Sequence, residues 1–317
     1  MIKKRKVVLV GTGFVGMSMA YSILNQNCGV NELVLIDVMK DKALGEAMDL
    51  SHGLPASSSH MRIKSGEYKE CKDADIVVIT AGLNQKPGQT RLELSEANAK
   101  IMKDITLQVV ESGFKGIFLI ASNPVDLMTK VVQEVSGFEP HKVIGSGTAL
   151  DTARLRFLVG QYLNISDKNV HAYIMGEHGD SSFVPWEHAY VGCKKVIDIL
   201  EDARKPLEDL DKIYLDVRDA AYEIIKLKKA TYYGIGLGLT KIIKTMLDDA
   251  NEILTVSSYL DGEYGQKDIY IGVPTIINSE GAREILELEL SKEDQSKLDN
   301  SCEVIREYME TINEAIK

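Results

Sequence analysis

The feature that most constrains this chain is a glycine-spaced turn, GTGFVG, at residues 11–16. An apolar run at residues 6–10 precedes it, and a helical pattern at residues 17–27 follows it. In this setting the first glycine permits the tight turn, the second lets a pyrophosphate approach the backbone, and the third lets the helix pack on the strand. The start of the helix offers free amides and a positive dipole to phosphates. The pattern predicts a dinucleotide site, whereas the glycines alone would also fit a purely structural turn.

An acidic residue, Asp37, closes the next apolar run, at residues 32–38. A carboxylate at this point of a dinucleotide-binding unit accepts hydrogen bonds from the adenosine ribose hydroxyls. A 2′-phosphate would meet like charge there. The sequence therefore favours NAD over NADP as the cofactor.

The first half of the chain alternates short apolar runs with helical patterns. We predict strands at residues 6–10, 32–38, 61–65, 75–80, 116–121 and 142–145. We predict helices at residues 17–27, 41–50, 92–111 and 125–134. Alternation of this kind, with strands rich in β-branched residues, indicates a buried parallel sheet.

Beyond about residue 150 the rhythm changes. We predict helices at residues 152–162, 184–191, 208–228, 239–251 and 292–316, and strands at 170–175, 253–258 and 269–276, the last two antiparallel. We therefore expect an α/β fold: a Rossmann-type parallel-sheet domain over residues 1–145, followed by a mixed α+β catalytic domain over residues 146–317. No linker or repeat separates the two, so they should pack closely together. A second glycine-rich segment, GIGLG at residues 234–238, lacks a preceding strand, and close packing explains it better than a second nucleotide site.

Composition excludes several classes of protein. The 317-residue chain has a formal net charge of -10, which argues against general binding of nucleic acid or of an anionic membrane. Its four scattered cysteines form no metal-binding or disulfide pattern, so we expect reduced thiols and no metal. The basic residues at 3–6 resemble the start of a signal peptide, but the apolar run after them is too short, and a first β-strand explains it better. We expect a cytoplasmic protein without a spanning helix.

Four side chains in the sequence could together support hydride transfer between a 2-hydroxy acid and nicotinamide. That chemistry needs a base, an acid that orients the base, and cations for the carboxylate and the reacting oxygen. His178 lies in a glycine-flanked turn, and Asp151 and Arg154 are spaced to share one helix face. Arg91 ends a polar loop after the strand at 75–80, and ligands bind such sheets at the carboxyl ends of their strands.

Taken singly, these residues have ordinary explanations. Most histidines are surface or satisfied core residues, and we give that reading to His52, His60, His141 and His188. A helix pair such as Asp151 and Arg154 is more often an exposed salt bridge. Only the motifs in combination favour a catalytic assignment.

The motifs occur together and in a characteristic order. They are GTGFVG, AGLNQKPGQTRLEL, ASNPVD, GSGTALDTARLR, GEHGDSS and KKATYYGIG, which extend from Lys6 almost to the carboxyl terminus. In this order the chain resembles the L-lactate/malate dehydrogenase family. The resemblance implies an NAD-dependent oxidoreductase of L-2-hydroxy acids, an enzyme of glycolysis and fermentation, and a homo-oligomer, most often a tetramer.

The resemblance also implies roles for the site residues. His178 would accept and donate the proton, and Asp151 would hold its other ring nitrogen. Arg154 would grip the substrate carboxylate through two parallel hydrogen bonds. Arg91 would close over the substrate and polarise its C2 oxygen, and Asn123 would lie beside the nicotinamide and that oxygen. The implied NAD contacts come from Gly11, Gly13, Val15, Gly16, Asp37, Lys42, Tyr68, Gly82, Leu83, Ser122, Asn123 and Ser146.

Gln85 is the residue that would select the substrate. By resemblance it faces the C2 substituent, where malate enzymes present an arginine, and a neutral amide suits the methyl group of lactate and pyruvate. An unpaired second carboxylate beside it would be costly to bury. Thr231 also matches the lactate type and would narrow the pocket. Malate or a bulkier 2-hydroxy acid remains an alternative, since a hydrophobic pocket discriminates weakly per methylene; a non-catalytic NADH-sensing domain is the alternative from another class.

Arg156 and His171 match the positions that bind fructose 1,6-bisphosphate in allosteric bacterial members of the family. Arg156 is two residues past Arg154 and therefore points off a different helix face. A bisphosphate bridging such cations across a subunit interface would couple neighbouring active sites. The alternative is that both are ordinary surface charges.

Overall fold

The computed structural model describes residues 4–83 and 91–316, with side chains described over 4–83 and 94–312. Its main feature is a nine-stranded sheet in the order β12-β11-β10-β6-β5-β4-β1-β2-β3. Six strands are parallel: β1 (Lys6–Val10), β2 (Glu32–Ile36), β3 (Arg62–Ser65), β4 (Ile76–Ile79), β5 (Ile117–Ile120) and β6 (Val143–Gly145). The predicted parallel, Rossmann-type sheet is confirmed, and its strand order reverses between β1 and β4.

The remaining three strands come from the second half of the chain and extend the same sheet. They are β10 (Glu252–Asp261), β11 (Lys267–Asn278) and β12 (Gly281–Ile285). β10 pairs antiparallel with β11, as predicted, and also with β6, where Ser257 lies opposite Gly145. The two halves of the chain therefore share one continuous sheet.

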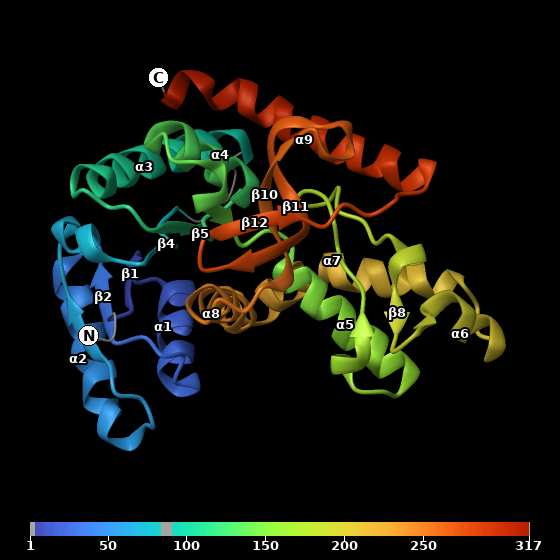
Figure 1. Cartoon of the computed structure of the whole chain (residues 1–317), viewed down its shortest axis with the longest axis horizontal. Coiled ribbons are helices and arrows are strands. Elements are labelled where there is room, and N and C mark those ends of the chain that lie inside the picture. The colour runs from blue at the N-terminus through green and yellow to red at the C-terminus, as the bar shows by residue number, and fades with distance from the viewer. Residues whose placement is uncertain (1–3, 84–90, 317) are drawn as a thin grey trace.

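Helices from both halves cover both faces of the sheet (Figure 1). On one face α8 (Tyr233–Leu247) packs on α1 (Phe14–Gln26). On the other, α9 (Lys292–Ile316) lies on α3 (Arg91–Glu111) and α4 (Val125–Ser136). The outer helix α2 (Lys40–Gly53) packs on β3. The close packing expected of the two halves is thus built from shared helix layers.

Strand β1 shows why the sheet is sandwiched in this way. All five of its residues are buried. Val7 and Leu9 belong to the core beneath α1 and α8, whereas Val8 and Val10 belong to the core beneath α3 and α4. Alternate side chains point to opposite faces of a strand, so a continuous apolar run needs cover on both sides.

A separate core forms outside the sheet, around α5 (Ala149–Leu163) and α7 (Glu208–Lys228). A small antiparallel sheet of β7 (Val170–His171), β8 (Tyr190–Val191) and β9 (Lys194–Lys195) packs there, followed by α6 (Val196–Asp202). The predicted helix at 184–191 is wrong, because this segment forms only a short 3-10 turn at Trp186–His188 and then enters β8, whose backbone pairs with β7 and β9. The predicted strand at 170–175 is shorter, ending at His171.

The second glycine-rich segment lies inside helix α8. This helix begins at Tyr233, six residues before the start that we predicted. A Cβ on Gly236 would come within 2.7 Å of the Ser18 Cβ and 2.8 Å of the Ser18 carbonyl carbon. Its role in close packing against α1 is therefore confirmed.

Within the described residues, no helix combines the length and the apolar character needed to cross a bilayer. Nor do three or more His, Cys, Asp or Glu side chains of that part of the chain group into a metal site. All four cysteines are free thiols, and Cys193 is the exposed one.

Candidate active site

His178 lies at the tip of a tight hairpin. Met175 and Phe183 exchange both backbone hydrogen bonds, and Gly176 adopts a φ of 102°, which favours glycine. The imidazole Nδ1 lies 2.6 Å from Oδ2 of Asp151, and 29% of the His178 side chain is exposed. The imidazole of His178 is thus held by Asp151 at Nδ1, and part of the side chain remains accessible to solvent.

Asp151 and Arg154 occupy the first turns of α5 and contact each other. Arg154 Nη1 donates to Asp151 Oδ1 at 2.9 Å, while Asp151 Oδ2 faces His178. Both side chains are largely buried. The prediction that they share one face of a helix is confirmed, and Asp151 also contacts the histidine.

The charges of these groups follow from their contacts. Burial alone would raise the pKa of Asp151, but the neighbouring His178 and Arg154 outweigh it and hold the pKa below the usual value. Burial alone would lower the pKa of His178, but Asp151 outweighs it and raises the pKa to about 9. Asp151 is therefore a carboxylate at neutral pH, Nδ1 of His178 carries a proton toward it, and Nε2 is the atom left for proton exchange.

A second carboxylate, Asp126, holds the histidine backbone and was missed by sequence reasoning. Its Oδ2 accepts the amide N–H of His178 at 2.8 Å, and its Oδ1 accepts the hydroxyl of Ser257. Burial raises its pKa to about 6, against the lowering effect of these two donors. Its place in the segment ASNPVD was the only available signal, and it did not identify the partner.

The glycine turn has the shape that a pyrophosphate requires. Gly11 has a φ of 100°, and a Cβ on it would lie 2.6 Å from the Ala81 nitrogen. A Cβ on Gly16 would lie 2.3 Å from the Gly11 carbonyl oxygen, so the helix start packs closely on the turn. Around Gly13, which precedes α1, a Cβ would meet nothing within 4 Å. The free space therefore lies at the helix amino terminus, where phosphate binds best.

Asp37 lies at the end of β2, beside this turn. Its Oδ2 accepts from both the amide and the hydroxyl of Thr12, at 2.7 and 2.8 Å, and its Oδ1 accepts the Met39 amide at 2.9 Å. Burial raises its pKa, but the amide and hydroxyl donors outweigh burial and leave the pKa below the usual value. Asp37 is thus a fixed carboxylate at the position expected for ribose binding.

Other predicted cofactor residues gather at the carboxyl ends of β4 and β5. The Ser122 hydroxyl donates to the Ala81 carbonyl at 2.6 Å. Asn98, a buried residue of α3 that sequence reasoning missed, accepts the Leu83 amide at 2.8 Å and donates to the Asn123 carbonyl at 2.9 Å. One amide side chain therefore joins the segments of Leu83 and Asn123, next to the glycine turn.

The remaining predicted cofactor residues have diverse environments. Lys42 is exposed on α2, and its charge contributes to the low pKa of Asp37. Burial raises the pKa of Tyr68 to about 12, with the charge of Asp37 also contributing. Val15 is partly buried in α1, and Ser146 is buried directly after β6. A Cβ on Gly82 would approach Asn98 Oδ1 at 3.5 Å.

Three predicted substrate residues are placed less completely. Gln85 lies outside the described residues, and Arg91 begins α3 with its side chain outside the described part. Thr231 precedes Tyr232, whose ring stacks on Phe14 of the glycine turn at a centroid distance of 5.1 Å. The segment of Thr231 therefore lies beside the cofactor turn.

The two predicted effector residues come from neighbouring elements, Arg156 from α5 and His171 from β7. Arg156 Nε donates to the carbonyl of Ala172 at 3.1 Å, and its guanidinium carbon lies 5.3 Å from the ring centroid of Tyr173. His171, the residue before Ala172, is exposed in β7. Burial lowers the pKa of Arg156. The Arg156 side chain thus contacts the two residues that follow His171 in the chain.

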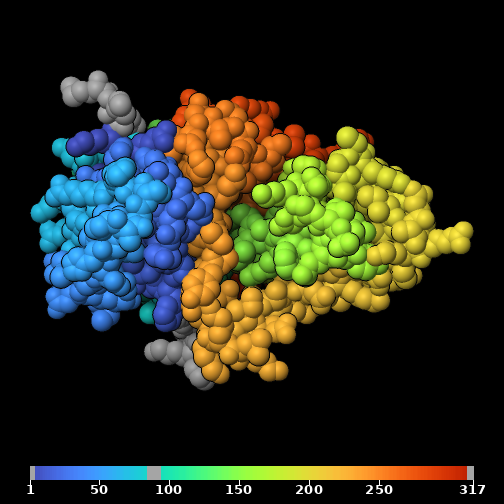
Figure 2. Space-filling view, turned by 90° about the horizontal axis from the view of Figure 1, so that it is seen from below, coloured from blue at the N-terminus to red at the C-terminus, as the bar shows by residue number. Residues whose placement is uncertain are grey.

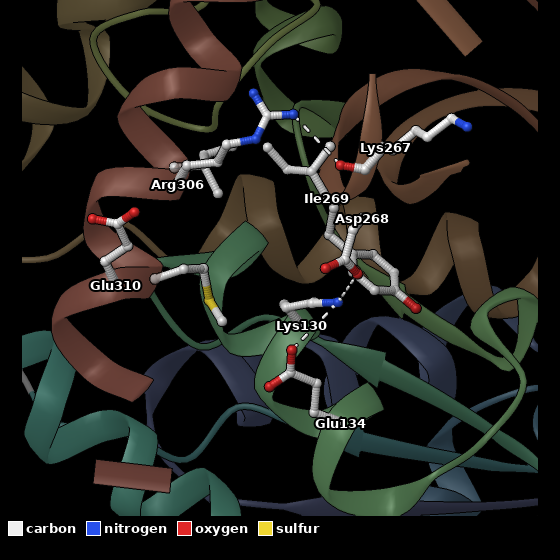
Figure 3. A pocket seen from close by; sticks show the side chains of 10 residues that line it. Lys130, Glu134, Lys267, Asp268, Ile269, Arg306 and Glu310 are labelled. Carbon is white, nitrogen blue, oxygen red and sulfur yellow. Dashed lines mark hydrogen bonds and ion pairs between the residues drawn. The ribbon is translucent and has the colours of Figure 1, made fainter. Parts of the chain in front are cut away.

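Two concavities flank these features. An apolar cavity of about 650 Å³ lies between α5, α8 and β10, in the hollow between the orange and green residues of Figure 2. A smaller one of about 230 Å³ lies between α4, α9 and β11 (Figure 3). In the smaller cavity, the ammonium group of buried Lys130 forms a salt bridge with Asp268, and its Nζ lies 3.3 Å from Oε1 of Glu134. The positive charge of Lys130 is therefore neutralised by these two carboxylates.

A parallel sheet with a phosphate turn at its point of strand reversal, and a carboxylate-bound histidine nearby, defines a nicotinamide-dependent dehydrogenase. Comparison with known proteins agrees. The NAD binding domain model of the lactate/malate dehydrogenases matches residues 5–145, and their alpha/beta C-terminal domain model matches residues 148–316. The chain belongs to the lactate/malate dehydrogenase family, and its cofactor is NAD.

Individual relatives are similar over almost the whole chain. L-lactate dehydrogenase 1 of Bacillus cereus is 56% identical over 305 residues, which cover 96% of this chain and 97% of the relative. A lactate dehydrogenase structure, MGS-M5 from a deep-sea metagenome library, has a TM-score of 0.96 at 50% identity and covers 98% of this chain and 100% of its own. The minor L-lactate dehydrogenase of Enterococcus mundtii, in its ligand-bound form, has a TM-score of 0.95 at 47% identity, with coverages of 98% and 99%.

Proposed function

We propose that this protein is an L-lactate dehydrogenase, which converts L-lactate and NAD⁺ reversibly to pyruvate and NADH. The observation that carries the proposal is the contact of one carboxylate, Asp151, with both His178 and Arg154. This arrangement joins a proton-transfer group to a carboxylate-binding group, as a 2-hydroxy acid requires. The names of the similar proteins support lactate as the substrate.

Proton transfer follows from the tautomer of His178. In lactate oxidation, Nε2 accepts the hydroxyl proton, and Asp151 stabilises the imidazolium that forms. In pyruvate reduction, the imidazolium returns that proton to the carbonyl oxygen. When bound, NAD supplies the hydride acceptor or donor. Because the pKa of His178 is raised, the histidine is charged and ready for pyruvate reduction at neutral pH.

Substrate binding is assigned to the arginines and neighbouring polar residues. Arg154, already oriented by Asp151, would hold the substrate carboxylate through its guanidinium plane. Arg91 would polarise the C2 oxygen, with Asn123 beside it, as the family resemblance implies. Gln85 and Thr231 would shape the pocket for a methyl substituent.

The described residues suit NAD. Gly13 leaves room for the pyrophosphate at the start of α1, and Asp37 presents a fixed carboxylate to the ribose. The other cofactor contacts that we propose are Gly11, Val15, Gly16, Lys42, Tyr68, Gly82, Leu83, Ser122, Asn123 and Ser146. We also propose that residues 1–145 and 146–317 act as the NAD-binding and catalytic domains.

A panel of 2-oxo acids tests the proposed substrate. Purified protein with NADH should consume pyruvate faster than oxaloacetate or 4-methyl-2-oxopentanoate, as measured by the loss of NADH absorbance. A preference for oxaloacetate would make the protein a malate dehydrogenase. A preference for the branched acid would indicate a dehydrogenase of bulkier 2-hydroxy acids. NADH binding without turnover of any acid would indicate a sensor.

We further propose a cytoplasmic homotetramer regulated by fructose 1,6-bisphosphate through Arg156 and His171. The hydrogen bond from Arg156 on α5 to the carbonyl of Ala172, the residue after His171, supports the effector site. Exposed Phe157 and Leu237 beside the 650 Å³ apolar cavity support subunit association. Titration of activity with the bisphosphate, at low and at neutral pH, tests the effector, and a flat response at both would refute it. Sedimentation analysis tests the tetramer.

A further inference from the structure

Two consecutive backbone amides in the catalytic hairpin are bound by side chains from two different helices. The amide of His178 donates to Asp126 on α4, and the amide of Glu177 donates to Ser301 on α9 at 2.7 Å. Asp126 and Ser301 are both buried. The peptide segment that carries the catalytic imidazole is therefore hydrogen-bonded to two different helices, and one of them is α9, the last helix of the chain.

The Ser301 hydroxyl lies within a closed set of hydrogen bonds. The Ser181 hydroxyl donates to Glu177 Oε2 at 2.6 Å, and the hydroxyls of Ser181 and Ser301 lie 3.0 Å apart. Because Ser181 uses its proton on Glu177, its oxygen is free to accept the proton of Ser301. Ser301 thus accepts from the amide and donates to the hydroxyl on opposite sides of one hairpin.

The hairpin is shaped around this hydroxyl. A Cβ on Gly176 would lie 2.7 Å from Ser301 Oγ, and a Cβ on Gly179 would lie 2.5 Å from Glu177 Oε1. Two glycines therefore leave the room in which Ser301 and the Glu177 carboxylate sit. In the motif GEHGDSS, the two glycines and the first serine therefore serve this arrangement.

Helix α9 is itself held firmly along its length. Asp299 accepts from Gln266 at 2.7 Å, and Arg306 donates to the Gln266 side chain, also at 2.7 Å. Gln295 donates to the Tyr264 carbonyl at 3.0 Å. Figure 3 shows Arg306 reaching from α9 toward the backbone of Lys267. Because these contacts lie before and after Ser301, they fix the position of its hydroxyl relative to the sheet.

We propose that Ser301 is a positioning residue for His178. By binding the Glu177 amide, it keeps Nδ1 of the imidazole against Asp151 and thereby orients Nε2 for proton transfer to and from the substrate. This inference rests on the proposed dehydrogenase function. The Ser301 hydroxyl contacts the Glu177 amide and the Ser181 hydroxyl, and it acts on the imidazole through the peptide segment of Glu177 and His178. The last helix of the chain thereby becomes part of the catalytic support.

Ser301→Ala removes the acceptor of the partly buried Glu177 amide and frees one side of the hairpin. We expect the kcat for pyruvate reduction to fall about ten- to a hundredfold, the cost of a small misplacement of a catalytic group. The KM for NADH should stay within about twofold, because the cofactor residues lie on other segments. The weaker contact with Asp151 should lower the pKa of His178 by about one unit.

The decisive measurement is the pKa of the His178 imidazole, followed by NMR in histidine-labelled protein and assigned with His178→Gln. This readout does not require turnover, so it stays informative even if the protein reduces no 2-oxo acid, an outcome that would refute the function alone. Ser22→Ala is the matched control, since Ser22 is a buried helix serine that accepts from Gln26 at 2.8 Å. Melting temperatures of both variants report general destabilisation.

A lower His178 pKa in Ser301→Ala, with an unchanged value in Ser22→Ala, supports the positioning role. A wild-type pKa and kcat in a Ser301→Ala protein that merely melts earlier would overturn it. If Ser301→Ala does not fold, Ser181→Ala decides, because it removes the acceptor of the Ser301 hydroxyl at a partly exposed position. A lowered His178 pKa in that variant supports the proposal, and a wild-type value overturns it.

Discussion

The carboxylate of Asp126 accepts the backbone amide of His178 at 2.8 Å and is only 3% exposed. Asp126 belongs to α4, which begins directly after the β5 end that carries Asn123. The hairpin that carries His178, in the second half of the chain, is therefore anchored to a helix of the first half. This contact brings His178, the proposed proton-transfer group, to the carboxyl ends of the parallel strands, where the proposed cofactor residues gather.

Asp126→Asn should lower the pKa of His178. The Asp126 pKa of about 6 makes it mostly ionised at neutral pH, and its charge helps raise the pKa of the histidine. An asparagine keeps an acceptor for the His178 amide but loses that charge. We expect the alkaline fall in the rate of pyruvate reduction to move to lower pH by about half a unit. Asp294→Asn, at another buried aspartate on α9, is the control, and equal profiles for Asp126→Asn and wild type would contradict the expectation.

The two reaction directions should depend on pH in opposite ways. Pyruvate reduction needs protonated His178, so its rate should fall as pH rises through about 9, while lactate oxidation should rise over the same range. The raised pKa also means that protonation stabilises the fold: this contribution is full below pH 6.5 and is lost as pH passes about 9. Steady-state rates in both directions provide the measurement, and limbs of the same sign would disprove the assigned role.

Gln85→Arg should shift the preference from pyruvate toward oxaloacetate. A guanidinium would pair with the second carboxylate of oxaloacetate, whereas the wild-type amide leaves that charge unpaired. The ratio of kcat/KM for the two acids is the quantity to measure, and we expect it to change at least about a hundredfold, since a buried charge pair is worth several kcal/mol. Gln89→Arg, elsewhere in the same loop, is the control. An unchanged ratio in Gln85→Arg would remove this residue as the discriminator.

Gly236→Ala should destabilise the protein, because its Cβ would lie within 3 Å of both the side chain and the backbone of Ser18 in α1. We expect a loss of about 1–3 kcal/mol in the free energy of unfolding, typical of overpacking. Gly238→Ala on the same helix is the matched control, since a Cβ there meets nothing within 4 Å. That variant should be stabilised by about 0.5–1 kcal/mol through helix propensity. Thermal unfolding of both compares them, and equal melting temperatures would rule out the packing argument.

Much of this molecule was predictable from short-range sequence patterns. The glycine turn at 11–16, the parallel strands and the helices at 208–228 and 292–316 all follow from local periodicity, and the structure confirms them. The spacing of Asp151 and Arg154 predicted a shared helix face for the same reason. Such features depend on residues three or four positions apart, or on the backbone conformation of single glycines. Local sequence patterns are therefore sufficient to predict them.

The tertiary structure alone decided which distant segments meet. No local pattern in the sequence indicated that β10 would pair with β6 and extend the first sheet, or that residues 184–191 would not form a helix. The backbone amide of His178 is bound by Asp126, 52 residues away in the sequence, and that of Glu177 is bound by Ser301, 124 residues away. A buried amide needs some acceptor, but which one it finds depends on the path of the whole chain.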